Sequence, residues 1–129
     1  MRLELSRRTD LAVRAIRSLA GSGRIKRPEL AAQAETTPDF LARVVAPLVK
    51  AGWVRSEVGR AGGYELAVDP ATLSMLDVIV AVEGSPDDGR CVLRGGPCGT
   101  QEVCSLHDAW THARQALMEQ LGRTPVMGD

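Results

Sequence analysis

Aromatic residues are almost absent from this chain of 129 residues, which has two tryptophans, one tyrosine and one phenylalanine. Its core must therefore be built from leucine, valine, isoleucine and alanine, and the length allows one domain of modest size, with room for an appended element. No stretch approaches the roughly 20 apolar residues that cross a bilayer, and no apolar signal segment follows Met1. We therefore expect a cytoplasmic protein that does not enter a membrane.

The chain also has no net charge, because its sixteen Lys/Arg balance its sixteen Asp/Glu. The charges are unevenly distributed. Residues 1–60 hold twelve Lys/Arg against six Asp/Glu, a balance of +6, and residues 61–129 have a balance of −6. A basic half joined to an acidic half is expected when only the first half meets phosphate groups. Two halves that pair with each other would give the same composition, so composition leaves both interpretations open.

The first half carries the pattern of a helix-turn-helix. Apolar residues recur at helical spacing over residues 9–20, where Thr9 can cap the helix. A short second helix is predicted after Pro28, and a third begins at Thr37 and ends near Gly52. In a helix-turn-helix, the second helix of the pair enters the major groove of double-stranded DNA.

Three polar residues of the third helix are candidates for DNA binding. Thr37, Arg43 and Lys50 are expected on its DNA side. Pro47 lies within the same helix and removes a backbone donor, which predicts a bend there.

A hairpin is predicted after the third helix. Apolar and polar residues alternate over residues 53–58 and 64–68, and the turn between them contains three glycines. Arg60 stands at the tip of this turn, where a basic residue can reach the DNA minor groove. The alternative for Arg60 is an ordinary solvated charge. A helix-turn-helix followed by a hairpin defines a winged helix.

The rest of the chain predicts two more helices with a long loop between them. Ser74 and Asp77 form a capping-box pattern for a helix ending near Glu83, and residues 84–103 form a loop rich in glycine and proline. The last helix, 105–121, has an apolar seam consisting of Leu106, Trp110, Ala113, Leu117 and Leu121. Such a seam packs on the core or pairs with a second copy, and two DNA half-sites favour a homodimer.

The predicted fold class is mainly α with a small β wing. A winged helix-turn-helix DNA-binding domain covers residues 1–70, and residues 71–129 supply the long loop and a long C-terminal dimerisation helix.

All three cysteines, Cys91, Cys98 and Cys104, fall within that loop and its end. An odd, clustered set does not suit a secreted disulfide framework, and soft thiolates favour an iron–sulfur cluster, zinc or copper(I). A structural zinc site usually has two cysteines only two to four residues apart, which this chain lacks. We therefore rank an iron–sulfur cluster (2Fe–2S or 4Fe–4S) first, a metal-free thiol switch second and zinc third.

Catalytic patterns are not found. The sequence has no nucleophile–base pair and no phosphate-binding glycine loop, and its two histidines both fall in the last predicted helix. We expect a protein that is not an enzyme.

Several longer runs carry a family resemblance that covers essentially the whole chain. They are Met1-Arg2-Leu3, Lys50-Ala51-Gly52-Trp53-Val54, Gly62-Gly63-Tyr64, Leu76-Asp77-Val78-Ile79-Val80-Ala81-Val82-Glu83-Gly84 and Cys104-Ser105-Leu106-His107-Asp108-Ala109-Trp110. With these runs the chain resembles the Rrf-two family of bacterial winged-helix regulators.

The resemblance implies a transcriptional regulator, favoured as a repressor, that binds a palindromic operator as a dimer. It also implies an iron–sulfur cluster on Cys91, Cys98 and Cys104 that senses redox, nitric oxide or iron status. The chain departs from the family pattern in three places. The first cysteine gap has six residues where five is common, Ala42 stands where some members have glutamate, and the wing arginine is displaced to Arg60.

Two residues are candidates for a fourth cluster ligand. The resemblance implies Asp10, donated by the partner subunit as in some family members, or His107, three residues after Cys104. We favour Asp10. Without the resemblance, Asp10 would be an acid suited to a helix N-terminus and His107 a surface histidine.

Overall fold

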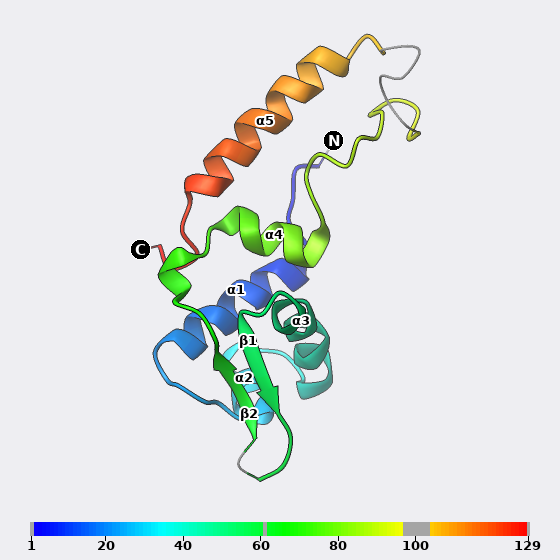
Figure 1. Ribbon diagram of the computed structural model, residues 1–129. Helices are drawn as coiled ribbons and strands as arrows, with labels where there is room; N and C mark the ends of the chain where they lie inside the picture. The colour runs from blue at the N-terminus through cyan, green and yellow to red at the C-terminus, as the bar shows by residue number, and fades with distance from the viewer. Residues whose placement is uncertain (1, 61, 97–103, 129) are drawn as a thin grey trace.

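The computed structural model describes residues 2–60, 62–96 and 104–128 (Figure 1). Within them the elements are, in chain order, α1 (Arg7–Ala20), α2 (Arg27–Gln33), α3 (Pro38–Lys50), β1 (Val54–Glu57), β2 (Gly63–Leu66), the short 3-10 helix η1 (Pro70–Thr72), α4 (Met75–Glu83) and α5 (His107–Arg123). None of the helices in these ranges has the length and apolar character needed to cross a membrane.

The core lies among α1, α2, α3 and the base of the hairpin. The helices contribute the inward residues expected from their helical spacing, and the core is closed by one side chain from each strand. Its fully or almost fully buried members include Leu11, Ala12, Ala15, Ile16, Leu19, Leu30, Leu41, Val44, Val45, Leu48, Val54 and Tyr64. Because the inward face of α3 is buried in this way, its other face is left for solvent.

The helix ends show which of the predicted capping residues begin the helices in the structure. Thr37 caps α3 as its position suggests, since its side chain accepts a hydrogen bond from the Phe40 N–H. The predicted cap of α1 was wrong: Ser6 caps that helix, and Thr9 is buried inside the first turn. α3 continues through Pro47 as one helix.

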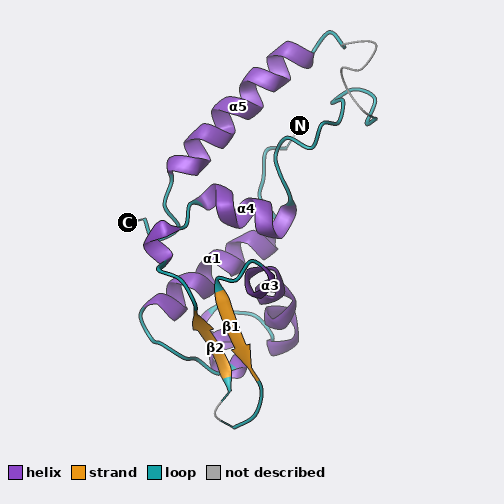
Figure 2. Ribbon diagram, in the orientation of Figure 1, coloured by secondary structure: helices purple, strands orange, loops and turns teal. Residues whose placement is uncertain are grey.

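The wing is a two-stranded antiparallel hairpin, registered from Val54 opposite Leu66 to Glu57 opposite Gly63 (Figure 2). Its strands are shorter than predicted. Ile25, just before α2, forms an isolated bridge with Tyr64 of β2. A side chain at Gly63 would meet the Ile25 carbonyl oxygen at 2.5 Å, so this close approach requires glycine.

α4 packs across α1 and α3, and Ser74 and Asp77 form the predicted capping box at its start. The chain end then returns to this region. Val126 is fully buried, its N–H donates to the Leu73 carbonyl, and its own carbonyl accepts from Arg17 Nε at 2.9 Å. This return anchors the C-terminal end of α5 to the core.

α5 and the loop before it extend from one end of the molecule, whereas the wing forms the opposite end (Figure 1). No residue of α5 is buried. The predicted class, mainly α with a small β wing and a long C-terminal helix, is confirmed.

Candidate nucleic-acid interface and cysteine loop

The solvent face of α3 presents two of the predicted DNA-binding residues together. Arg43 and Lys50 are two turns apart, and both line an open groove of about 610 Å³ with Ala46 and Pro47. Ala81 of α4 forms the rim of this groove. Thr37 lies at the other end of α3, exposed, with its hydroxyl oxygen accepting from the Phe40 N–H at 3.2 Å.

Arg60 lies on the turn of the wing and is exposed. Within the part of the chain that the structure describes, none of Arg43, Lys50 and Arg60 takes part in an ion pair. Neighbouring acids among the described residues therefore do not neutralise their positive charges. These charges are available to phosphate groups of DNA, two from α3 and one from the wing.

The strands of the wing differ from its turn, because their basic residues and the neighbouring Arg24 have acidic partners. Arg24 pairs with Glu57 and with Glu65, each at 3.2 Å, and Arg55 lies 3.5 Å from Glu65. Part of the positive charge counted in the first half of the sequence is thus neutralised locally. The charge available for phosphate groups is concentrated on fewer residues than composition indicated.

The cysteine loop, residues 84–104, contains Cys91 and ends with Cys104. Neither forms a disulfide, and their exposed fractions are 6% and 7%. The Cys91 N–H donates to the Gly96 carbonyl at 2.7 Å, and this hydrogen bond closes the segment between the two residues into a turn. Cys98 lies outside the described residues.

His107, the alternative fourth ligand, is the first residue of α5 and is partly exposed. Its backbone N–H donates to the Cys104 carbonyl at 3.1 Å, so the two residues share one turn of chain. Among the described residues, no three His, Cys, Asp or Glu side chains come together as a metal-binding group.

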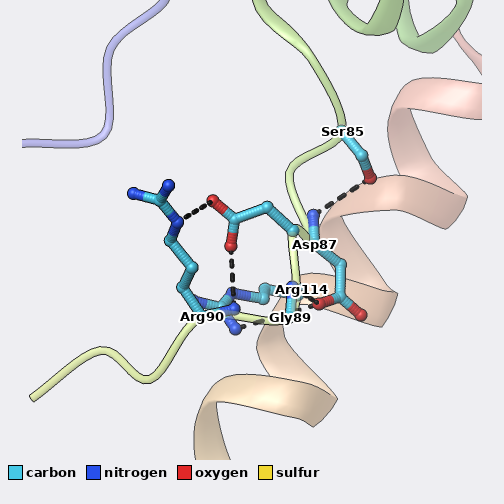
Figure 3. A network of polar contacts seen from close by, with 6 residues as sticks. Ser85, Asp87, Gly89, Arg90 and Arg114 are labelled. Atoms are coloured by element: carbon cyan, nitrogen blue, oxygen red, sulfur yellow. Dashed lines mark hydrogen bonds and ion pairs between the residues drawn. The ribbon is translucent and has the colours of Figure 1, made fainter. Parts of the chain in front are cut away.

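The first part of the loop is tied to α5 by polar contacts (Figure 3). The Asp87 carboxylate accepts from the Gly89 N–H at 3.3 Å and lies 4.0 Å from Arg114 Nη1 of α5. Ser85 accepts from the Asp87 N–H at 3.2 Å, which shapes the turn. Neither Asp87 nor Arg114 is marked in the sequence as a contact residue, because no motif links residues this far apart.

Asp10, the favoured fourth ligand, is exposed in the first turn of α1 and forms an ion pair with Arg14 at 3.2 Å. Arg14 also binds Glu35, in the turn before α3, at 3.1 Å. The hydrogen bond and charge of Asp10, together with Glu35, raise the pKa of Arg14 above its usual value. The carboxylate of Asp10 therefore already has a cationic partner within its own chain.

Glu83, the last residue of α4, is a further structural link that no pattern in the sequence predicts. One of its carboxylate oxygens accepts from the Ser6 N–H at 3.0 Å and from the Thr9 hydroxyl. Because the cysteine loop starts at the next residue, this carboxylate joins the beginning of the loop to the beginning of α1.

A helix-turn-helix with a hairpin wing and unneutralised basic residues on both defines a winged-helix DNA-binding protein. The chain matches the family model Rrf2, described as an iron-dependent transcriptional regulator, over residues 5–127. It therefore belongs to the Rrf2 family of transcriptional regulators, as the resemblance in its sequence predicted.

Individual relatives extend this result. A Mycobacterium tuberculosis protein described as an HTH-type transcriptional regulator is 32% identical over 127 residues, which are 96% of this chain and 79% of the relative. The structure of IscR from T. potens is similar with a TM-score of 0.73 and 25% identity, covering 96% of this chain and 83% of that one. CymR, the global cysteine regulator of B. subtilis, also gives 0.73, with 26% identity and coverage of 97% and 94%.

Proposed function

We propose that this chain represses transcription as a homodimer on an inverted-repeat operator, and that an iron–sulfur cluster on Cys91, Cys98 and Cys104 controls its affinity for DNA. The observation that carries the proposal is the division of the molecule into two ends. Among the residues that the structure describes, basic residues without acidic partners gather at α3 and the wing, and two buried cysteines lie in and at the end of the loop at the other end. A regulator of this kind acts where the chromosome is, in the cytoplasm.

The dimer is supported by the exposed apolar surface of α5. α5 has 17 residues and buries none of them, so its contacts with α4 cover its apolar seam only in part, and Leu117 of that seam is 45% exposed. A second copy would cover this seam and place two reading helices on one duplex. In this arrangement residues 1–70 bind DNA and residues 71–129 bind the partner and the cluster.

For DNA binding we assign Arg43 and Lys50 to contacts from α3, Thr37 to the entry of that helix, and Arg60 to the minor groove. The test is the affinity of wild type and Arg60→Ala for a selected inverted-repeat duplex over a range of salt. Phosphate contacts make wild-type affinity fall steeply with salt, and loss of Arg60 should weaken operator binding by about 1–3 kcal/mol. A wild-type affinity that does not change with salt concentration contradicts the DNA-binding assignment. An Arg60→Ala affinity equal to that of wild type means that Arg60 is an ordinary surface charge.

The donor set fits an iron–sulfur cluster. Cys91 and Cys104 are not joined in a disulfide and are shielded from water, and thiolates are the ligands that such clusters prefer. When bound, the cluster would supply a group that responds to oxidants, nitric oxide or iron supply. The chain's own contribution is to hold the thiols on a loop that Asp87 and Glu83 connect to α5 and α1.

A thiol switch without metal is the second candidate, and one comparison favours it specifically. CymR, named as a cysteine regulator, shares this fold over 97% of the chain. A disulfide between two of the cysteines would then replace the cluster, leaving one thiol free. Zinc ranks third.

The experiment that separates these candidates is anaerobic purification followed by visible absorption and iron and sulfide analysis. The cluster proposal predicts visible absorption that is lost in Cys91→Ala, Cys98→Ala and Cys104→Ala. A colourless protein without iron that binds DNA only after reduction or oxidation would instead establish the thiol switch, and one that retains zinc would establish the third candidate.

For the fourth ligand we propose Asp10 from the partner subunit, with His107 as the alternative. Asp10 would have to leave Arg14, its present partner at 3.2 Å, so cluster binding and this ion pair compete. Asp10→Ala should alter the cluster spectrum, while His107→Ala leaves it unchanged. The reverse result would assign the ligand to His107 within one chain.

A further inference from the structure

A groove of about 310 Å³ lies between the beginning of α2 and the wing. Lys26 and Arg27 line it from the side of α2, and Tyr64 lines it from the side of the wing together with Gly59, Gly62 and Gly63. We infer that this groove binds a phosphate group of the DNA backbone, with Arg27 and Lys26 as its ligands. The inference rests on DNA binding by the winged helix and adds a phosphate site that lies apart from α3 and from the wing tip.

The backbone fixes the position of Lys26 and Arg27 relative to the wing. Ile25 and Tyr64 exchange two hydrogen bonds, Ile25 N–H to Tyr64 oxygen at 2.9 Å and Tyr64 N–H to Ile25 oxygen at 2.8 Å. Gly63 allows this approach because it has no side chain to meet the Ile25 carbonyl. The segment entering α2 is thereby held against β2, and the two walls of the groove form one unit.

Tyr64 also holds the Arg27 side chain. Arg27 Nε donates to the Tyr64 hydroxyl oxygen at 3.2 Å, and the guanidinium carbon lies 6.0 Å from the centre of the ring. This contact uses one of the five N–H donors of the guanidinium, so those of the two terminal nitrogens remain for another acceptor. An arginine held in this way loses little side-chain freedom when it binds a phosphate, and its planar fork matches phosphate geometry.

The charges around the groove favour an anion. Among residues 2–60, 62–96 and 104–128, neither Lys26 nor Arg27 has an ion-pair partner. Glu57 also lines the groove, but its carboxylate lies 3.2 Å from Arg24, which offsets its charge. Two cations therefore remain without an acid, on a groove wide enough to admit a phosphate.

The location suits the backbone of a duplex. In a helix-turn-helix the second helix enters the major groove while the first crosses the DNA backbone. α2 is that first helix, and the groove lies where α2 begins and meets the wing. A contact there would position the protein on the duplex without reading sequence.

The test uses a random-sequence duplex of about 30 base pairs, because a phosphate contact does not depend on the operator. Binding is followed by fluorescence anisotropy between about 50 and 200 mM salt for wild type and Arg27→Ala. Each lost phosphate contact reduces the slope of log K against log salt by about 0.9, so we expect a reduction of about 1.8 for a dimer. The affinity at the lowest salt should fall at least about tenfold.

Three variants control this result. Arg123→Ala removes an exposed arginine from the last turn of α5 and should leave the slope at the wild-type value. Arg27→Lys keeps the charge and should keep most of the slope. Tyr64→Phe keeps the ring and removes only the hydroxyl, so affinity should fall about two- to fivefold with the slope unchanged. Circular dichroism and sedimentation verify that each variant is a folded dimer.

The outcomes separate this inference from the function on which it rests. If wild type shows no salt-dependent binding, DNA binding itself fails. If wild type binds and Arg27→Ala matches Arg123→Ala in slope and affinity, the phosphate site is wrong and DNA binding stands. A parallel NMR titration of the Arg27 Nε–H with inorganic phosphate at constant ionic strength distinguishes the sources. A shift there, combined with an unchanged DNA slope, would make the groove a site for free phosphate and overturn the inference.

Discussion

The wing end and the cysteine end of this molecule are held together in different ways. At the wing end, α3 buries one whole face, and the hairpin is joined to the segment before α2 by backbone hydrogen bonds. At the cysteine end, α5 buries none of its residues, and Asp87 and Arg114, at 4.0 Å, tie it to the loop. The first end is held by contacts within one chain, whereas in our proposal the second end is completed by a partner copy and a bound cluster.

The same difference applies to charge. On the strands of the wing, Glu57 and Glu65 neutralise Arg24 and Arg55, so the remaining positive charge is restricted to particular positions. At the cysteine end, Asp87 and Asp88 lie near arginines of that end, Arg114 and Arg90, each at 4.0 Å. Acidic residues therefore limit where DNA can bind at one end and shape a loop at the other.

The largest effect on folding is expected from the core beneath the reading helix. Leu48→Ala removes a fully buried side chain of α3 and should lower the free energy of unfolding by about 2–5 kcal/mol. Leu93→Ala, in the cysteine loop where the side chain is 61% exposed, should change it by less than about 0.5 kcal/mol. Denaturant unfolding measures both. Equal losses for the two variants would mean that the ends are stabilised alike.

Self-association of the protein should depend on the cysteine end, where α5 exposes its apolar seam. Leu117→Lys keeps the helical propensity of α5 but places two charges in a paired seam, so the dimer dissociation constant should rise about 100-fold. Gln115→Lys, also exposed on α5 but off the seam, is the matched control. Sedimentation velocity reads the result, and a Leu117→Lys dimer as tight as the control would remove α5 from the interface.

The next largest effect on stability is expected where the wing meets the segment before α2. Gly63→Ala adds a carbon 2.5 Å from the Ile25 carbonyl at a backbone φ of +131°, and should cost about 1–3 kcal/mol of unfolding free energy. Gly21→Ala, at an open position with ordinary φ, should be neutral or slightly stabilising. A Gly63→Ala protein as stable as Gly21→Ala would show that the two walls of the groove are not rigidly joined.

The smallest effect concerns the link between α1 and the start of the cysteine loop. Thr9→Val keeps the shape of a buried side chain and removes the hydroxyl that donates to Glu83, which should cost about 0.5–1.5 kcal/mol. Glu83→Gln retains an acceptor oxygen for the Thr9 hydroxyl and the Ser6 N–H and should cost less. Thermal unfolding ranks the two, and the opposite order would mean that this contact does not hold the first turn of α1.

Local patterns predicted the elements well because caps and turns act over a few residues. Thr37 and the pair Ser74 and Asp77 cap helices where the sequence indicated, and the wing follows from its alternation and glycines. The cap of α1 was misplaced because Ser6 caps the helix three residues earlier, and the Thr9 hydroxyl instead donates to Glu83, 74 residues away in the chain.

Contacts between distant residues account for the rest. The burial of Val126 and the contact between Arg27 and Tyr64 depend on how elements pack, and no spacing in the sequence marks them. The charge count was likewise too coarse, since Arg24 lies in the basic half but is neutralised by acids that only folding brings near.

The central claim, that the cysteine end controls the DNA-binding end, is tested most directly by one comparison. The affinity for a selected operator duplex is measured anaerobically for protein reconstituted with iron and sulfide and for the same protein after its iron is chelated. The account predicts a difference of at least about tenfold, a coupling free energy of about 1.4 kcal/mol, that disappears in Cys91→Ala and Cys104→Ala. Equal affinities with and without iron would contradict it.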